Sequence, residues 1–96
     1  MTDKLILELY TRPTCSDCQQ AKGFLALHQI PYVDKDVSKD LKLEDDLKTI
    51  SGTRIVPSFV FYNKNIWGKK KIHKNIIGFE PNKQEIMELL NVPVVQ

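Results

Sequence analysis

Both cysteines of the chain lie within one Cys-x-x-Cys motif, at the point where an apolar strand gives way to a helix. Residues 5–10 form a nearly continuous apolar run that suits an interior strand, and Pro13 bounds it. A helix is predicted from Cys15 to about His28, because apolar residues recur there at spacings of three and four. Cys18 falls on the buried stripe of this helix and Cys15 at its exposed tip, so the two thiols are unequal by geometry.

The start of a helix is a favourable place for a redox dithiol. Backbone N–H groups are unpaired there and the helix dipole is positive, so a thiolate at Cys15 is stabilised. Cys18, nearly one turn further along, is close enough to form a tight disulfide and thereby to resolve a mixed disulfide at Cys15. We therefore expect Cys15 to attack a substrate disulfide and Cys18 to resolve the product.

The next part of the chain predicts two more strands and a helix. A second strand is expected at residues 30–37, parallel to the first because a helix connects them. Apolar spacing then indicates a second helix that ends at Gly52, a natural helix terminator. Residues 55–62 are strand-like except for Pro57, which belongs at the beginning or edge of its strand because proline cannot donate to a sheet ladder.

The last part of the chain predicts one strand and one helix. A turn region at residues 63–68 precedes a fourth strand at residues 72–77. Asn82, three residues before Glu85, resembles a helix N-cap with its reciprocal partner and indicates a final helix. The predicted order is strand, helix, strand, helix, strand, strand, helix, which is an α/β fold.

Length, charge and hydropathy bound the class of protein. With 96 residues, the whole chain is expected to be one domain, residues 1–96. Lys and Arg number 14 against 12 Asp and Glu, a balance too close to neutral to suggest nucleic acid or a membrane as the partner. No window approaches the roughly 20 apolar residues of a membrane span, and charged residues interrupt the N-terminal segment. We expect a cytoplasmic protein, in which a Cys-x-x-Cys is catalytic or metal-binding rather than structural.

Metal binding is an alternative use of the two cysteines. A zinc site needs about four ligands, whereas the motif supplies two, and His28 and His73 are the only histidines. A dimer that shares two Cys-x-x-Cys motifs, through Cys15 and Cys18 of each chain, would still be able to bind zinc or an iron–sulfur cluster. No metal site is expected within one chain.

The element order, with Cys-x-x-Cys after the first strand and Val56-Pro57 opening the third, resembles the thioredoxin fold in its compact glutaredoxin form. The likeness covers nearly the whole chain. Local features of the glutaredoxin family occur in the segments Leu9-Tyr10-Thr11-Arg12, Ala21-Lys22, Ile30-Pro31-Tyr32, Val56-Pro57 and Gly78-Phe79. The resemblance implies a four-stranded mixed sheet and a dithiol–disulfide oxidoreductase that requires no bound cofactor.

The same resemblance implies which residues surround the dithiol. In the family, the proline that matches Pro57 is cis and lies beside the dithiol. The backbone of the preceding residue, here Val56, pairs with a substrate peptide or glutathione. The basic residue at the position of Arg12 faces glutathione or acidic partners and supports the thiolate. Gly78 and Phe79 complete the expected substrate-binding residues.

The segment at residues 78–82, Gly-Phe-Glu-Pro-Asn, resembles the Gly-Phe-Arg-Pro-Asp segment of certain redoxins. Those redoxins supply electrons to ribonucleotide reductase and draw them from thioredoxin reductase; Glu80 and Asn82 depart from their pattern. Glutathione-using members carry Gly-Gly followed by an aspartate, whereas this chain has Phe79 and no aspartate nearby. The expected partners are a disulfide-containing protein and, as reductant, thioredoxin reductase or a low-molecular-weight thiol, with the chain acting as a monomer.

Asp17 distinguishes this motif from the Cys-Pro-Tyr-Cys of many glutaredoxins. A negative charge near both sulfurs should oppose thiolate formation and work against the helix dipole. This predicts a more reducing pair than a typical glutaredoxin, nearer to the potential of thioredoxin at about −270 mV than to the roughly −200 to −230 mV of glutaredoxins.

The opening of the chain also resembles the Spx and arsenate-reductase family. Spx members bind RNA polymerase and sense oxidation, but they are longer and carry an inserted helical region. Their third strand follows an arginine-proline pattern, whereas this chain reads Val56-Pro57. Because the opening of the chain has this resemblance, a redox-responsive regulator is the alternative to the oxidoreductase.

Overall fold

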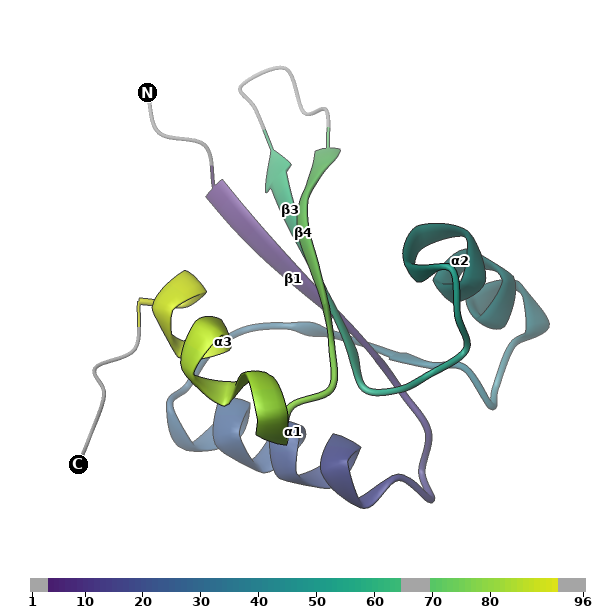
Figure 1. Ribbon diagram of the computed structural model, residues 1–96, viewed down its shortest axis with the longest axis horizontal. Helices are drawn as coiled ribbons and strands as arrows, with labels where there is room; N and C mark the ends of the chain where they lie inside the picture. Colours follow the sequence, from purple (N-terminus) through teal and green to yellow (C-terminus); the bar gives the residue numbers. More distant parts are fainter. Residues whose placement is uncertain (1–3, 65–69, 92–96) are drawn as a thin grey trace.

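The computed structural model describes residues 4–64 and 70–91 (Figure 1). The elements follow in the order β1 (Lys4–Thr11), α1 (Ser16–Leu27), β2 (Val33–Asp36), α2 (Leu41–Ser51), β3 (Ser58–Lys64), β4 (Lys70–Ile77), η1 (Glu80–Asn82) and α3 (Lys83–Leu89). The strands form a four-stranded sheet in the order β2-β1-β3-β4, in which β1 and β2 are parallel and the other pairs antiparallel. The predicted α/β fold, mixed sheet and element order are confirmed, and the structure adds the short 3₁₀ helix η1.

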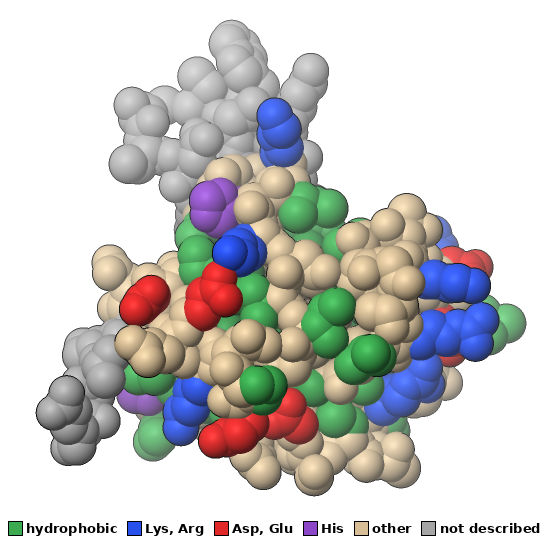
Figure 2. Space-filling model, viewed as in Figure 1, with side chains coloured by type: hydrophobic (Ala, Val, Ile, Leu, Met, Phe, Trp, Pro, Cys, Tyr) green, Lys and Arg blue, Asp and Glu red, His purple; other side chains and the backbone are tan. Residues whose placement is uncertain are grey.

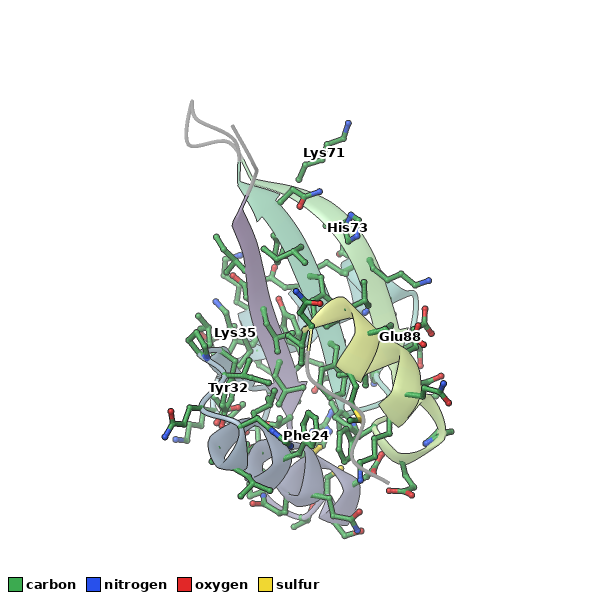
Figure 3. The ribbon with its side chains drawn as sticks, turned by 90° about the vertical axis from the view of Figure 1, so that its left-hand side faces the viewer. Phe24, Tyr32, Lys35, Lys71, His73 and Glu88 are labelled. Atoms are coloured by element: carbon green, nitrogen blue, oxygen red, sulfur yellow. The ribbon has the colours of Figure 1, made fainter. Side chains whose placement is uncertain are left out.

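Helices cover both faces of the sheet. α1 and α3 lie on one face and α2 on the other (Figure 1). Because alternate residues of a strand point to opposite faces, β1 contributes to both cores. Leu7 and Leu9 pack toward α1 and α3, whereas Tyr10 packs toward α2. From the helix side, Phe24 of α1 points toward the sheet (Figure 3). This burial on both faces explains the almost continuously apolar sequence of β1.

β2 is shorter than predicted, since it begins at Val33 and not at residue 30. The backbone N–H groups of residues 29 and 30 donate to carbonyls in the last turn of α1, so this segment closes the helix instead of pairing with β1. Pro31 has no N–H to give to a ladder. The sequence pattern is apolar on both sides of this boundary, which is why it did not reveal where the strand starts.

The ends of β3 and β4 follow from proline chemistry and from the hairpin between them. β3 begins at Ser58, directly after Pro57, as expected for a residue that cannot donate to the ladder. β4 begins at Lys70, two residues before the predicted start at residue 72. The turn predicted at residues 63–68 falls largely on residues 65–69, which lie outside the described residues.

Asn82 is the N-cap residue of α3, as predicted, but the predicted capping hydrogen bond is wrong. Its side chain makes no capping bond, because the residue ends η1 with φ −116° and ψ 14° and does not have the extended backbone of a typical N-cap. Its Nδ2 group instead donates to the carbonyls of Ile77 at 2.7 Å and Gly78 at 3.2 Å. Glu85, the expected reciprocal partner, forms an ion pair with Lys74 of β4 at 2.6 Å. Asn82 therefore fixes the loop after β4.

The boundaries of α2 have clear local causes. The side chain of Asp40 accepts a hydrogen bond from the N–H of Lys42 at 2.9 Å and caps the start of the helix. Gly52 ends it with φ 78°, a left-handed conformation that glycine adopts without strain, and this confirms the predicted terminator. None of the helices that the structure describes is long and apolar enough to cross a membrane.

Candidate active site

The two cysteines lie at the first turn of α1 with unequal exposure. Cys15 is the N-cap residue and is partly exposed, whereas Cys18 is fully buried, with 0% of its surface exposed. The Cys15 Sγ accepts a hydrogen bond from the backbone N–H of Cys18 at 3.1 Å and lies 3.8 Å from the carbonyl oxygen of Val56. A sulfur that caps a helix N-terminus receives N–H donation, which favours its thiolate form.

Cys18 is held as a neutral thiol by its surroundings. Burial, and after it the hydrogen bond with the side chain of Cys15, raises the pKa of Cys18 from its ordinary 9.0 to about 12. Desolvation disfavours the charged form of any thiol that lies away from water. At neutral pH the buried sulfur therefore keeps its proton, and the partly exposed sulfur is the one available to an incoming disulfide.

This raised pKa predicts an alkaline loss of stability in the reduced protein. The folded state favours the neutral thiol, so its contribution is complete below the unfolded pKa near 9 and is lost as the pH rises toward 12. Between pH 9 and pH 11, we expect Cys18 to account for a fall on the order of 2 kcal/mol in the free energy of unfolding. Urea unfolding of the reduced protein at both pH values measures it, and Cys18→Ala should show the shallower decline. Equal declines in the two proteins would contradict the assignment.

The loop before β3 lies beside the dithiol. The Val56–Pro57 peptide bond is cis, as the family resemblance implies, and Pro57 is buried. Its carbonyl accepts a hydrogen bond at 2.8 Å from the N–H of Gly78, so the loops before β3 and after β4 are joined. Val56 faces Cys15 with its carbonyl oxygen. These contacts bring four of the sequence-predicted site residues, Cys15, Val56, Pro57 and Gly78, to one end of the sheet.

Phe79 belongs to the core and not to a substrate-facing surface. Only 2% of its surface is exposed, and its ring packs against Phe24 and Phe59, with centroids 5.4 and 6.1 Å apart. Its backbone N–H is already occupied by the carboxylate of Asp17 at 2.9 Å. The Phe79 side chain therefore anchors the loop after β4, and its expected place among the substrate-binding residues stays a prediction.

Gly78 has a backbone conformation that other residues adopt only with strain. Its φ is +92°, and a Cβ added there would lie 3.4 Å from Cγ of Pro81. Gly78→Ala should lower the free energy of unfolding by roughly 1–2 kcal/mol. Gly23 is the matched control, because it is an exposed residue inside α1 with nothing within 4 Å of the added Cβ. Gly23→Ala should raise stability by roughly 0.5–1 kcal/mol. Chemical denaturation of both variants checks the opposite signs.

Arg12 lies in an ion-pair cluster and is not a free cation beside the sulfur. Its Nη2 is 3.3 Å from Oε2 of Glu44, and the other oxygen of Glu44 is 3.3 Å from Nε of Arg54. Lys and Arg side chains gather over α2 on this side of the molecule (Figure 2). Glu44 therefore shares the charge of Arg12, and the expected support of the thiolate by Arg12 stays a prediction. No spacing in the sequence links residues 12, 44 and 54, so the cluster was missed.

The charge of Asp17 raises the pKa of Cys18, in the predicted direction, although it is the smallest of the causes. The two carboxylate oxygens of Asp17 accept hydrogen bonds from the backbone N–H groups of Phe79 at 2.9 Å and Glu80 at 3.3 Å. From its place in the sequence, Asp17 is expected to put a negative charge near both sulfurs. The structure also uses its carboxylate to join α1 to the loop after β4.

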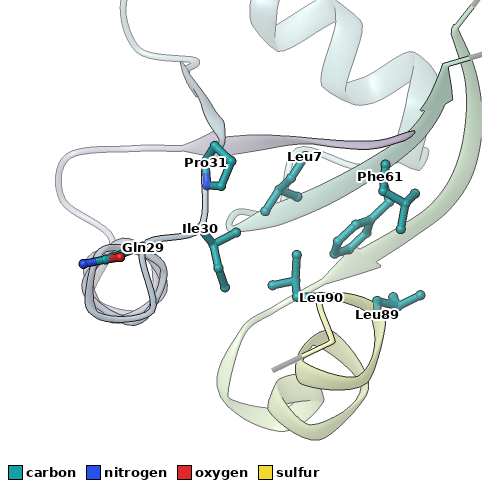
Figure 4. A pocket seen from close by; sticks show the side chains of 8 residues that line it. Leu7, Gln29, Ile30, Pro31, Phe61, Leu89 and Leu90 are labelled. Carbon is teal, nitrogen blue, oxygen red and sulfur yellow. The ribbon is translucent and has the colours of Figure 1, made fainter. Parts of the chain in front are cut away.

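Two hollows of the described surface have neither cysteine in their linings. One of about 260 Å³ opens between β1, the segment after α1 and the end of α3 (Figure 4), and its lining residues are Leu5, Leu7, Gln29, Ile30, Pro31, Phe61, Leu89 and Leu90. This lining contains no acid, base or nucleophile. Among the described residues, no group of three or more His, Cys, Asp or Glu is placed to hold a metal ion.

Comparison with known proteins agrees with this geometry. A family model described as Glutaredoxin matches residues 7–66, well over half of the chain. The chain belongs to the glutaredoxin family. The matched part of this glutaredoxin-family chain includes both cysteines and the Val56-Pro57 pair, but it ends before Gly78.

Individual relatives of this glutaredoxin-family chain differ in how much of it they match. An uncharacterized glutaredoxin-like 8.6 kDa protein in the rubredoxin operon of Clostridium pasteurianum is 32% identical over 85 residues, which are 88% of this chain and 97% of that protein. Global transcriptional regulator Spx 2 of Bacillus cereus is 40% identical over 42 residues, 44% of this chain. The chain matches only 32% of that regulator's length. A mutant of the thioredoxin-like protein BC3987 has a solved structure with TM-score 0.71 and 26% identity, covering 91% of this chain and 96% of that one.

Proposed function

We propose that the protein is a dithiol–disulfide oxidoreductase that uses Cys15 and Cys18. The observation that carries this proposal is the unequal exposure of the two cysteines. The sulfur of Cys15 is partly exposed at the N-cap of α1, whereas Cys18 is buried. The backbone N–H of Cys18 donates to the Cys15 sulfur at 3.1 Å. Membership of the glutaredoxin family, whose members are generally thiol–disulfide oxidoreductases, supports it.

The reaction proceeds through two thiol–disulfide exchanges. The Cys15 thiolate attacks one sulfur of the substrate disulfide, forms a mixed disulfide and releases the other sulfur as a thiolate that takes up a proton. The Cys18 thiol then loses its proton and attacks Sγ of Cys15. The Cys15–Cys18 bond forms, the mixed disulfide breaks and the second substrate thiol is released. The substrate has gained two electrons and two protons. An external reductant then supplies two electrons and two protons to the Cys15–Cys18 disulfide and regenerates the dithiol.

The surroundings of Cys15 suit a disulfide presented on an extended segment. Val56 and Pro57 lie beside the sulfur and are expected to offer backbone contacts to a protein or small-molecule disulfide. Arg12, although paired with Glu44, keeps 32% of its side chain exposed and can meet an acidic substrate group. Gly78 joins this rim through its hydrogen bond to Pro57. The substrate-binding role of these residues is part of the proposal.

We further propose that thioredoxin reductase or a low-molecular-weight thiol resets the dithiol, with ribonucleotide reductase as one candidate acceptor of its electrons. The likeness of residues 78–82 to reductase-coupled redoxins supports this, as does the absence of a second glycine at Phe79. We expect a monomeric single domain that works in the cytoplasm, where such reductants keep thiols reduced.

An NADPH-consumption assay with a disulfide substrate tests the function. The purified protein is supplied either with thioredoxin reductase or with glutathione and glutathione reductase. We expect turnover with thioredoxin reductase and little with glutathione. Turnover only with glutathione would keep the activity but reverse the choice of reductant, and silence in both assays would point to another low-molecular-weight thiol or to a regulator.

A redox-responsive regulator is the second candidate, favoured by the 40% identity to Spx 2 over 42 residues. The same assays discriminate it, because a regulator would form the Cys15–Cys18 disulfide with peroxide without reducing a substrate catalytically. The metal-binding dimer requires two chains to supply four thiolates. Size-exclusion chromatography with zinc and iron analysis of the reduced protein tests that alternative.

A further inference from the structure

We propose that Asp17 is a positioning residue that keeps the Cys15 thiolate reactive by anchoring the first turn of α1 to the loop after β4. This inference rests on the proposed function, in that Cys15 is the attacking thiol. It reverses the expectation from sequence, in which the charge of Asp17 opposes the thiolate.

The anchor consists of two hydrogen bonds between distant parts of the chain. The carboxylate of Asp17 accepts from the N–H of Phe79 at 2.9 Å and from the N–H of Glu80 at 3.3 Å, across more than 60 residues. Both oxygens are thereby engaged with backbone donors. Hydrogen bonds to an ionised acceptor are stronger than those between neutral groups, so each of these bonds resists displacement.

The loop that receives the anchor is itself fixed. The N–H of Gly78 donates to the carbonyl of Pro57 at 2.8 Å, and the side chain of Asn82 donates to the Ile77 and Gly78 carbonyls. The ring of Phe79 is buried in the core. Asp17 therefore binds to a rigid part of the fold that also carries the segment next to Cys15.

The anchored side chain adjoins the peptide unit that stabilises the sulfur. The N–H that donates to Cys15 Sγ at 3.1 Å belongs to Cys18, and it is part of the peptide bond between Asp17 and Cys18. Holding the Asp17 side chain restrains the orientation of that peptide unit. Because N–H donation favours a thiolate, release of the anchor would weaken the stabilisation of Cys15.

Charge and anchoring make opposite predictions for the removal of Asp17. A free carboxylate would disfavour the neighbouring thiolate, so its removal would make Cys15 more reactive. Here the carboxylate is compensated by two N–H donors, and its charge is the smallest of the influences that act on the pKa of Cys18. The geometry therefore favours anchoring as the dominant effect.

The test compares Asp17→Ala and Asp17→Asn with the wild type. In the reduced proteins, iodoacetamide alkylates Cys15 at pH 7 with release of iodide, and mass spectrometry identifies the modified cysteine. We expect Asp17→Ala to slow alkylation about three- to tenfold, the range of one lost hydrogen bond. Asp17→Asn keeps one acceptor oxygen, so its alkylation should be slowed less than that of Asp17→Ala. The redox potential, measured by equilibration with a thiol–disulfide buffer, should become more negative, because the reduced thiolate form is stabilised less.

Glu80→Gln is the matched charge control. It removes a negative charge at the same corner, where the Glu80 side chain is exposed, and it retains the backbone N–H that binds Asp17. We expect less than a twofold change in the alkylation rate. Circular dichroism establishes whether each variant is folded. If Asp17→Ala is unfolded, the change in the Cys15 alkylation rate of Asp17→Asn tests the inference.

Unchanged or faster alkylation of folded Asp17 variants, or a more positive potential, would overturn the inference. These readouts need no catalytic turnover, so they separate the inference from the proposed function. If Asp17→Ala is alkylated more slowly but the wild type reduces no substrate, the anchoring role stands and the proposed enzyme activity is rejected. Normal turnover by the wild type with faster alkylation of Asp17→Ala would retain the enzyme and reject the anchor.

Discussion

Replacement of Cys15 by serine is expected to lower the rate of disulfide reduction by at least about a thousandfold. A hydroxyl is not ionised at neutral pH and cannot form a disulfide, so the first exchange loses its nucleophile and the second loses the sulfur that Cys18 attacks. The fold should survive the change, because Cys15 is the N-cap of α1 and accepts from the N–H of Cys18, and serine is a preferred N-cap residue. The NADPH-coupled assay gives the rate, and urea unfolding gives the stability.

Cys18→Ser is the matched control for that experiment, because it removes the other thiol of the pair. Attack by Cys15 remains possible, but no second thiol breaks the mixed disulfide, so a covalent substrate adduct should accumulate on Cys15. Mass spectrometry under non-reducing conditions detects the adduct. Substantial turnover by Cys15→Ser, or an adduct on Cys18 in the wild type, would exclude the assigned order of attack.

The second large effect is expected in the core beneath the dithiol helix. Leu25 of α1 is completely buried against the sheet, with 0% of its surface exposed. Leu25→Ala removes its apolar contacts and leaves a cavity, which should lower the free energy of unfolding by roughly 2–5 kcal/mol. Urea unfolding measured by circular dichroism gives the difference.

Leu27 is a control in the same helix with the same side chain. It is 76% exposed, and Leu27→Ala should change stability by less than about 0.5 kcal/mol. The contrast isolates burial, because helix propensity changes equally at both positions. Similar losses in the two variants would mean that α1 does not pack on the sheet through the face that carries Leu25, and therefore that Cys18, on this face, is not buried as described.

Local sequence was a good guide to the elements and to the inequality of the thiols. Burial on both faces makes β1 almost continuously apolar, and burial on one face gives α1 its three- and four-residue spacing, so both patterns are visible in the sequence. Because Cys15 and Cys18 are nearly one helical turn apart, the geometry of the turn puts one thiol at the exposed helix start and the other on the buried face. Gly52 ends α2 because its backbone is left-handed. Each of these features depends on residues that are close together in the chain.

Boundaries and caps were harder to predict, because several local patterns compete for the same residues. The segment at residues 30–32 is apolar enough for a strand, but its first N–H group completes the end of α1 and Pro31 has none to offer. Asn82 has the residue type and spacing of an N-cap, yet η1 precedes α3 and directs its side chain to the loop after β4. In both cases a hydrogen bond made on folding decides between two locally acceptable structures.

The chemical surroundings of the dithiol were decided by tertiary structure. Local sequence patterns already indicate the α/β order, the helix that carries both cysteines and the exposed position of Cys15. Only the fold brings Glu44 to Arg12 and the N–H groups of the loop after β4 to Asp17, across 32 and 62 residues. Side-chain charge can be read from a sequence, but whether that charge faces a thiolate or is compensated by a distant donor depends on which surfaces pack together.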